Sequence, residues 1–162
     1  MHDKRWVLTA TCSDLTMFSR TIKPTQAYVP GKTPRHEEGA FDSVRATARA
    51  GMSVDALTDC AAFQTGLEYL DTGYYWEAHE VLEPVWMVLP NNSDERYLVQ
   101  ALIQLANARL KLCMGRPKAA LRLCGIVQKL LWSISMTVVM GIDIAEVCNE
   151  VAGFAQHLRC AL

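Results

Sequence analysis

The sequence predicts an all-α fold: a single compact bundle of five to six helices with an extended N-terminal arm. Apolar residues recur at helical spacing along most of residues 36–162, and no segment alternates apolar and polar residues in the way of a half-buried strand. With 162 residues, of which 51% are hydrophobic and 20% charged, the chain is long enough to bury one core. We therefore expect residues 36–162 to form one helical domain.

Residues 1–35 are expected to form an extended or partly disordered arm. They show no clear periodicity, and Pro24, Pro30, Gly31 and Pro34 interrupt the segment. The apolar run from Trp6 to Ala10 is too short for the core of a secretory signal. The cytoplasm is therefore the expected location.

Helix boundaries are indicated by turn and capping residues. Gly51 and Gly73 are typical residues just past a helix, Ser93 and Asp143 are typical N-caps, and Pro84 is expected to bend the helix that contains it. Pro117 suits the first turn of a helix. The expected helices cover Phe41–Ala50, Asp59–Thr72, Tyr74–Leu89, Asp94–Met114, Pro117–Ser135 and a last segment from the cap Asp143 to Leu158.

The charge and cysteine patterns argue against several classes of partner. Net charge is −1, and the seven cations between Arg96 and Ile142 are better explained by helix dipoles and neighbouring acids than by nucleic acid. The six cysteines contain no C-x-x-C pair and are typical of small buried residues in a reducing compartment. The apolar run from Leu130 to Ile142 is broken by polar residues. We expect no nucleic-acid partner and no membrane association.

Two short motifs resemble known sites and are set aside. The stretch from Gly31 to Thr33 resembles the end of a phosphate-binding loop, but Gln26 stands where the pattern needs glycine. The stretch from His79 to Glu83 resembles a zinc-protease helix with glutamate in place of the second histidine, and no third ligand is indicated by spacing. No cofactor and no metal site are predicted, and a metal is kept only as a less favoured alternative to a small polar ligand at this helix.

One helix pair places polar groups where apolar ones are expected. On a helical wheel, one face of Tyr74–Leu89 carries Tyr75, Trp76, His79, Leu82, Glu83 and Trp86. A buried carboxylate is costly unless paired, so a His79–Glu83 pair one turn apart would offset that cost. The next helix carries a narrow polar stripe of Gln100, Gln104, Asn107 and Lys111. Because helices joined by a short turn pack antiparallel, we expect these amides near His79 and Glu83.

The same two helices carry a family signature. Gly73 followed by Tyr74–Trp86 (YYWEAHEVLEPVW), and then Gln100–Ala106 (QALIQLA), resembles the domain of unknown function 309 family of small bacterial and archaeal helical proteins. The stretches Gly115–Leu121 and Tyr28–Gly39 are similar to further parts of that pattern, so the resemblance covers about residues 24–158. It implies a helical bundle and marks His79, Glu83, Trp86, Gln100 and Gln104. It implies no activity, and Pro84 departs from its pattern.

Two hypotheses from different classes follow. The first is a small polar-ligand pocket between the third and fourth helices, with His79 and Glu83 as candidate acid–base residues. Its candidate ligand-binding residues are Trp76, Trp86, Gln100, Gln104, Asn107 and, if the arm folds over the pair, Arg35 and His36. The second is a non-enzymatic interaction or scaffold protein in which the same network fixes helix register, and in which tryptophans serve a homo-oligomer or partner interface.

Overall fold

The computed structural model describes residues 23–162, and helices account for most of them. The all-α prediction is confirmed, while expectations that concern residues 1–22 lie outside the described part of the chain. In chain order the elements are α1 (Asp42–Arg45), α2 (Val54–Thr58), α3 (Ala61–Thr72), α4 (Tyr75–Val88), α5 (Asp94–Cys113), α6 (Pro117–Trp132), β1 (Val138–Val139), β2 (Ile142–Asp143) and α7 (Ile144–Cys160).

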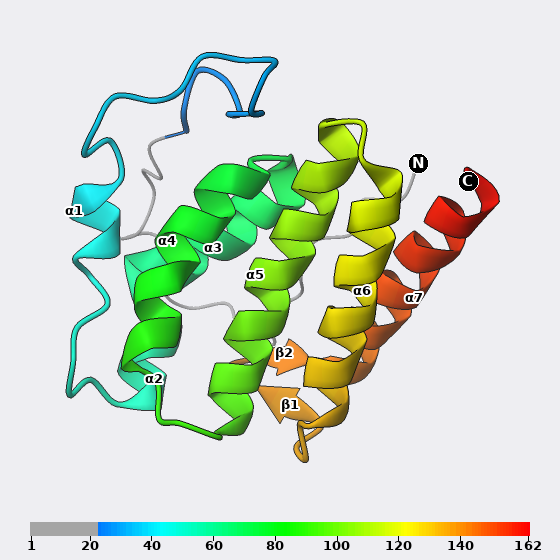
Figure 1. Ribbon diagram of the computed structural model, residues 1–162. Coiled ribbons are helices and arrows are strands. Elements are labelled where there is room, and N and C mark those ends of the chain that lie inside the picture. The colour runs from blue at the N-terminus through cyan, green and yellow to red at the C-terminus, as the bar shows by residue number, and fades with distance from the viewer. Residues whose placement is uncertain (1–22) are drawn as a thin grey trace.

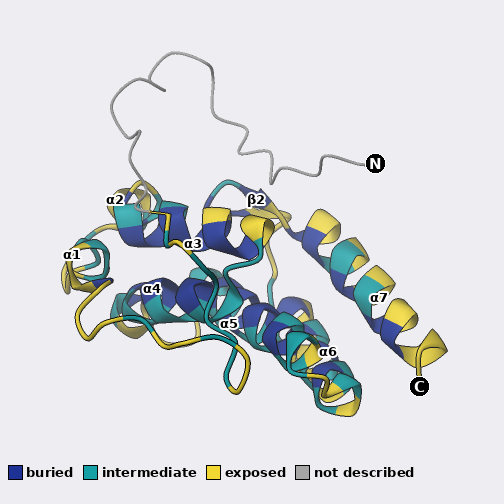
Figure 2. Cartoon of the chain, turned by 90° about the horizontal axis from the view of Figure 1, so that it is seen from above, coloured by how far each residue is buried: buried dark blue, intermediate teal, exposed yellow. Residues whose placement is uncertain are grey.

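The five longer helices pack in chain order. α3 contacts α4, α4 contacts α5, α5 contacts α6 and α6 contacts α7, as the neighbouring ribbons in Figure 1 show. This order follows from the short turns, because a short turn between two helices brings them side by side and antiparallel. Figure 2 shows α5 mostly buried or half-buried, whereas α7 keeps an exposed face. None of the helices within residues 23–162 is long and apolar enough to cross a membrane.

The predicted helix boundaries between α3 and α7 hold closely. Gly73 ends α3 with a φ of 90°, a backbone conformation that glycine adopts without a Cβ penalty. The Ser93 hydroxyl accepts the Arg96 N–H at the start of α5, and Pro117 lies in the first turn of α6. Asp143 caps α7 through the N–H groups of two following residues. Each boundary therefore has a local cause that the sequence carries.

The segment from Phe41 to Cys60 differs from the prediction. The expected helix Phe41–Ala50 is reduced to α1, and α2 forms separately with Ser53 as its N-cap. Thr47 supplies a reason, because its hydroxyl donates to the Val44 carbonyl at 2.7 Å and accepts the Ala62 N–H at 2.9 Å. A threonine hydroxyl that bonds backbone groups in this way competes with helix continuation.

A minimal hairpin, β1 and β2, joins α6 to α7 and was not predicted. Val138 pairs with Asp143 and Val139 with Ile142 in antiparallel register, and the loop residues Met140 and Gly141 both have positive φ. A two-residue loop with two positive φ angles matches the twist of a hairpin. Strands of two residues are too short to show an alternating pattern.

Arg109 ties α5 to three other helices, α3, α4 and α7. Its guanidinium forms an ion pair with Glu150 of α7, donates to the Leu70 carbonyl of α3 at 3.1 Å, and lies 5.8 Å from the centre of the Tyr75 ring. Burial lowers the pKa of Arg109, with Tyr75 and Asp71 acting in the opposite sense. Each contact gives this buried cation a compensating partner, as burial of a charge requires.

Candidate functional site

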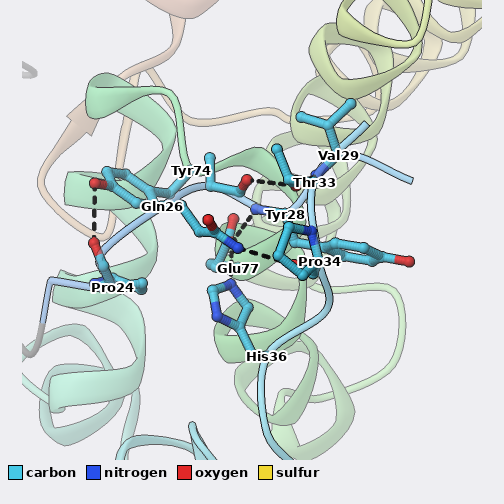
Figure 3. Close-up of polar contacts among 10 residues, drawn as sticks. Pro24, Gln26, Tyr28, Val29, Thr33, Pro34, His36, Tyr74 and Glu77 are labelled. Atoms are coloured by element: carbon cyan, nitrogen blue, oxygen red, sulfur yellow. Dashed lines mark hydrogen bonds and ion pairs between the residues drawn. The ribbon is translucent and has the colours of Figure 1, made fainter. Parts of the chain in front are cut away.

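The arm from Lys23 onward lies over the end of the bundle where α3 joins α4 (Figures 1 and 3). Tyr74 donates its hydroxyl to the Pro24 carbonyl at 3.1 Å, and Lys32 donates to the Cys113 carbonyl at 2.5 Å. Within the arm, the Thr33 hydroxyl accepts the Val29 N–H at 2.7 Å and so closes a tight turn. These contacts give the arm a defined path across α4 and the end of α5.

Glu77 is the buried anchor of this arrangement. Its side chain is 0% exposed, and its Oε1 accepts the backbone N–H of Tyr28 at 2.6 Å and Nε2–H of His36 at 2.5 Å (Figure 3). Its Oε2 is also buried and has no hydrogen-bond partner among residues 23–162. Burying a carboxylate is costly, and two short charge-assisted hydrogen bonds on one oxygen offset part of that cost.

Aromatic rings surround the Glu77–His36 pair. The His36 ring centre lies 5.9 Å from that of Trp76 and 5.2 Å from that of Phe41. Tyr28 meets the Trp76 ring edge-on at 5.2 Å. Such edge-to-face contacts hold rings in defined orientations. The imidazole is therefore held in position by its rings as well as by the carboxylate.

The same carboxylate affects a buried phenol. Burial raises the pKa of Tyr69 to about 12, and the charges of Glu68 and then Glu77 act in the same direction. Tyr69 packs against Phe41 and Tyr74, with ring centres 6.3 Å and 5.6 Å away. The aromatic side chains beneath the arm are therefore packed directly against the core residues of α3.

A cavity of about 560 Å³ opens beside this pair. Its walls come from the segment between the arm and α1, from α1 itself and from the outer side of α4. The lining includes Arg35, His36, Glu37, Glu38, Phe41, Asp42, Arg45, Trp76 and Glu80. This volume is within the range of small-molecule sites, and its lining combines two aromatic rings with several charged groups.

Arg45 connects α1 to α4 along the cavity wall. Its Nη1 donates to the Glu80 carbonyl at 2.6 Å and to Glu80 Oε2 at 3.1 Å, and its Nη2 lies 3.6 Å from Glu83 Oε2. Both carboxylates are partly exposed, so the ion pairs contribute modestly to stability. Their geometric effect is to fix one edge of the cavity.

The structure divides the sequence-predicted ligand residues into two groups. Arg35, His36 and Trp76 come together: the Arg35 guanidinium lies over the Trp76 ring, 5.8 Å from its centre, and His36 packs against the same ring. Gln100, Gln104 and Asn107 lie half-buried on α5. No hydrogen bond of the described residues joins them to His79 or Glu83.

His79 and Glu83 lie beside the buried stripe of α4, not on it. The buried stripe consists of Glu77, Ala78, Val81, Leu82 and Val85, whereas His79 is half-buried and the Glu83 side chain is 41% exposed. The helical wheel of Tyr74–Leu89 predicted that His79 and Glu83 point into the bundle, and the structure places them at its partly exposed side instead.

Trp86, a further candidate ligand residue, packs against α5. The Arg96 guanidinium lies 4.3 Å from the centre of its ring and donates to the Leu89 carbonyl at 2.7 Å. The indole Nε1 is buried with no partner among residues 23–162. One face of Trp86 is therefore already covered by a cation.

Glu77 and Tyr28, which join the arm to α4, were missed from the sequence. Most of the cavity wall was also missed, namely Glu37, Glu38, Phe41, Asp42, Arg45 and Glu80. One signal could have indicated Glu77, because it heads the helical row that continues with Val81 and Val85. A carboxylate at the head of an apolar row predicts a buried, partnered charge. Tyr28 acts through its backbone N–H, so its side chain carried no signal.

Comparison with known proteins gives one family. The model of the family described as Domain of unknown function (DUF309) matches residues 63–123. Neither the search of curated proteins nor the search of solved structures finds a match. The matched segment holds most of α3, all of α4 and α5, and the start of α6, so it includes Trp76 and Glu77 but not the arm with His36. The resemblance to the DUF309 family seen in the motif of α4 and α5 is therefore confirmed over residues 63–123.

Proposed function

We propose that the chain binds a small polar molecule in the cavity between α1, α4 and the segment that starts at Arg35. The observation that carries this proposal is the buried Glu77 carboxylate, which holds His36 in the cavity wall at 2.5 Å. A buried ion pair is weak evidence for a stabilising role, because apolar residues of similar volume often serve stability equally well. A carboxylate that orients a histidine beside a cavity is better explained by a role for that histidine.

The geometry also indicates which nitrogen of His36 is available. Because Nε2–H donates to Glu77, a neutral imidazole carries its proton on Nε2 and offers Nδ1 as an acceptor. Nδ1 makes no hydrogen bond within residues 23–162. A ligand with an N–H or O–H group suits this nitrogen. If the site is catalytic, His36 is the proton-transfer residue and Glu77 its positioning residue.

The acid–base pair predicted from the sequence, His79 and Glu83, belongs to a second version of the pocket between α4 and α5. There Trp86, Gln100, Gln104 and Asn107 would contribute, and Glu83 would have to exchange its contact with Arg45 for a ligand. The cavity beside His36 and the presence of Trp76 in its wall favour the first version.

The two versions are separated by paired variants. A library of small amines, acids, sugars and nucleosides is screened by thermal shift on the parent chain, and each stabilising compound is then titrated into His36→Ala and His79→Ala. We expect the shift to disappear in His36→Ala and to persist in His79→Ala and in the exposed control His157→Ala. Loss only in His79→Ala would move the site to the α4–α5 version. A compound that stabilises all three variants equally would place it elsewhere.

One observation favours a second function, an interaction protein that pairs with another copy of itself. Trp132, Met136 and Val138 are exposed by 78%, 55% and 44% within one short stretch at the end of α6. Large exposed apolar side chains that are close together indicate an interface. Light scattering across a dilution series tests this: a dimer that Trp132→Ser converts to a monomer supports it, and a strict monomer at all concentrations rejects it.

A further inference from the structure

We infer that the ligand of this cavity carries a cationic amine or guanidinium group, and that Arg35 occupies its place on the Trp76 ring when the site is empty. This inference rests on the proposed function, since it names the chemistry of the ligand for the same cavity. Three features of the described residues support it: the fixed orientation of the Trp76 ring, the weak attachment of Arg35, and the excess of carboxylates in the cavity wall.

The Trp76 ring is held so that a cation can lie over it. Tyr28 and Phe41 meet it at ring-centre distances of 5.2 Å and 6.1 Å, and His36 packs at 5.9 Å with a tilt of 33°. The Arg35 guanidinium lies 5.8 Å from the ring centre. An indole ring is the best aromatic partner for a cation, and this one already has a guanidinium beside it.

Arg35 is weakly attached compared with the other cation over a tryptophan. Arg96 lies closer to its ring, at 4.3 Å from Trp86, and is anchored by a hydrogen bond to the Leu89 carbonyl. Arg35 is exposed and forms neither a hydrogen bond nor an ion pair with any residue in the range 23–162. A side chain held only by a ring can be displaced by a ligand that offers the same charge with further contacts.

The cavity wall carries more carboxylates than cations. Arg45 is already neutralised by Glu80 and Glu83. The remaining acids of the wall, Glu37, Glu38 and Asp42, form no ion pair within the described chain. Carboxylates beside a low-dielectric wall raise the local concentration of cations. An anionic ligand would instead be repelled by these three carboxylates. Arg35 would be the one cation of the lining that is available to pair with it.

An organic cation therefore gains contacts that Arg35 lacks. Its charged group can lie over Trp76 while its N–H groups donate to His36 Nδ1 and to the carboxylates of the wall. Arg35 would have to move aside, so the empty protein carries a built-in competitor. Removal of that competitor is expected to tighten binding.

The test is calorimetric titration of the full-length chain with agmatine and putrescine. Glutarate and pentanediol serve as an anionic and a neutral probe of similar length. We expect the two cations to bind and the other probes not to bind. Arg35→Ala is expected to strengthen agmatine binding about threefold. This is the gain expected if Arg35 covers the Trp76 ring in about two thirds of the molecules, because the apparent Kd scales inversely with the fraction of molecules that can bind. Trp76→Leu is expected to abolish binding, and the exposed control Arg122→Ala to leave it unchanged.

The outcomes separate this inference from the proposed function. Weaker or equal agmatine binding by Arg35→Ala would overturn the stand-in role of Arg35. Binding of glutarate or pentanediol in place of the cations, lost in His36→Ala, would overturn the cationic class but keep the pocket. Failure of every probe, together with thermal shifts that do not depend on His36, would remove the pocket and the inference together. Trp76→Phe, which keeps an aromatic ring, checks that loss in Trp76→Leu is not a folding defect.

Discussion

His36 donates Nε2–H to Oε1 of Glu77 at 2.5 Å, across 41 positions of the chain. The same oxygen accepts the Tyr28 N–H, so one carboxylate holds two points of the arm against α4. The arm in turn contributes Arg35 and His36 to the cavity. Closure of the arm and construction of the site therefore depend on the same buried group.

Replacement of Glu77 is expected to destabilise the fold. Glu77→Ala leaves the Tyr28 N–H and the His36 ring without their acceptor, which is expected to lower the free energy of unfolding by roughly 2–4 kcal/mol. Glu77→Gln keeps an oxygen that can accept the Tyr28 N–H, so a smaller loss of about 1–2 kcal/mol is expected. Urea denaturation followed by circular dichroism measures both.

The control for the Glu77 variants is Glu146→Gln, at an exposed position of α7 that also loses one negative charge. Its stability is expected to stay within about 0.5 kcal/mol of the parent. If Glu77→Gln is as stable as this control, the carboxylate does not hold the arm in the way described.

Acid is expected to weaken the contact between Asp94 and the segment after α6. Asp94 Oδ2 accepts the Ser135 hydroxyl at 2.8 Å and the Met136 N–H at 3.0 Å, and these bonds, the hydroxyl first, lower the pKa of Asp94. A lowered pKa stabilises the fold above the ordinary value of 3.8, and this contribution is lost as the pH falls through the folded-state value. The stability advantage of the parent over Asp94→Asn is therefore expected to be constant above pH 3.8 and to shrink as the pH falls through the folded-state pKa.

Urea midpoints of the parent and Asp94→Asn, measured at neutral pH and at several acid values, check this expectation. Ser135→Ala removes the largest contribution and is expected to reduce the same advantage. An advantage that does not change with pH would contradict the assignment of the shift to Asp94.

The Tyr69 phenol is expected to ionise well above the ordinary pKa of a tyrosine. Burial raises its pKa from 10.0 to about 12, so the neutral phenol is favoured in the folded chain. This contribution to stability is complete below pH 10.0 and is lost as the pH rises toward 12. An ultraviolet phenolate titration is expected to show a step near pH 12 in the parent and none in Tyr69→Phe. Retention of that step in Tyr69→Phe would assign it to another group.

The helices that have local stop and start signals were predictable from the sequence. α3 to α7 begin or end at Gly73, Ser93, Pro117 and Asp143, each through a backbone conformation or cap that acts within a few residues. The early end of α1 was not predictable, because it depends on Thr47 reaching Ala62 on another element, whereas α2 begins at a local cap, Ser53. Local signals thus account for boundaries, and a long-range hydrogen bond accounts for the exception.

The candidate site shows the same division. The sequence indicated Trp76, His36 and Arg35 as candidates. It placed the buried charge at His79 and Glu83, however, which lie on a different side of α4 from the buried Glu77. A wheel of α4 alone treats Trp76 as an inward residue, whereas the arm covers that side of the helix from outside. The position of the buried charge therefore depends on where the arm docks, which no single-helix pattern contains.

Gly66 provides a test of how closely α3 and α4 pack. A Cβ atom added at Gly66 would lie 2.4 Å from Cδ2 and 2.5 Å from Cγ of Leu82, far inside van der Waals contact. Both residues are buried, and Leu82 is 0% exposed, so the leucine has little room to move. Gly66→Ala is expected to lower the free energy of unfolding by about 1–3 kcal/mol through overpacking, despite the better helix propensity of alanine.

The matched control for Gly66→Ala is Gly125→Ala in α6, where an added Cβ meets nothing within 4 Å. There the gain in helix propensity is unopposed, and an increase of about 0.5–1 kcal/mol is expected. The two alanines differ only in what surrounds them, so opposite signs in urea denaturation would isolate the packing of Gly66 against Leu82. Equal gains would show that α3 and α4 can separate at this point, which would also move Glu77 relative to the core that buries it.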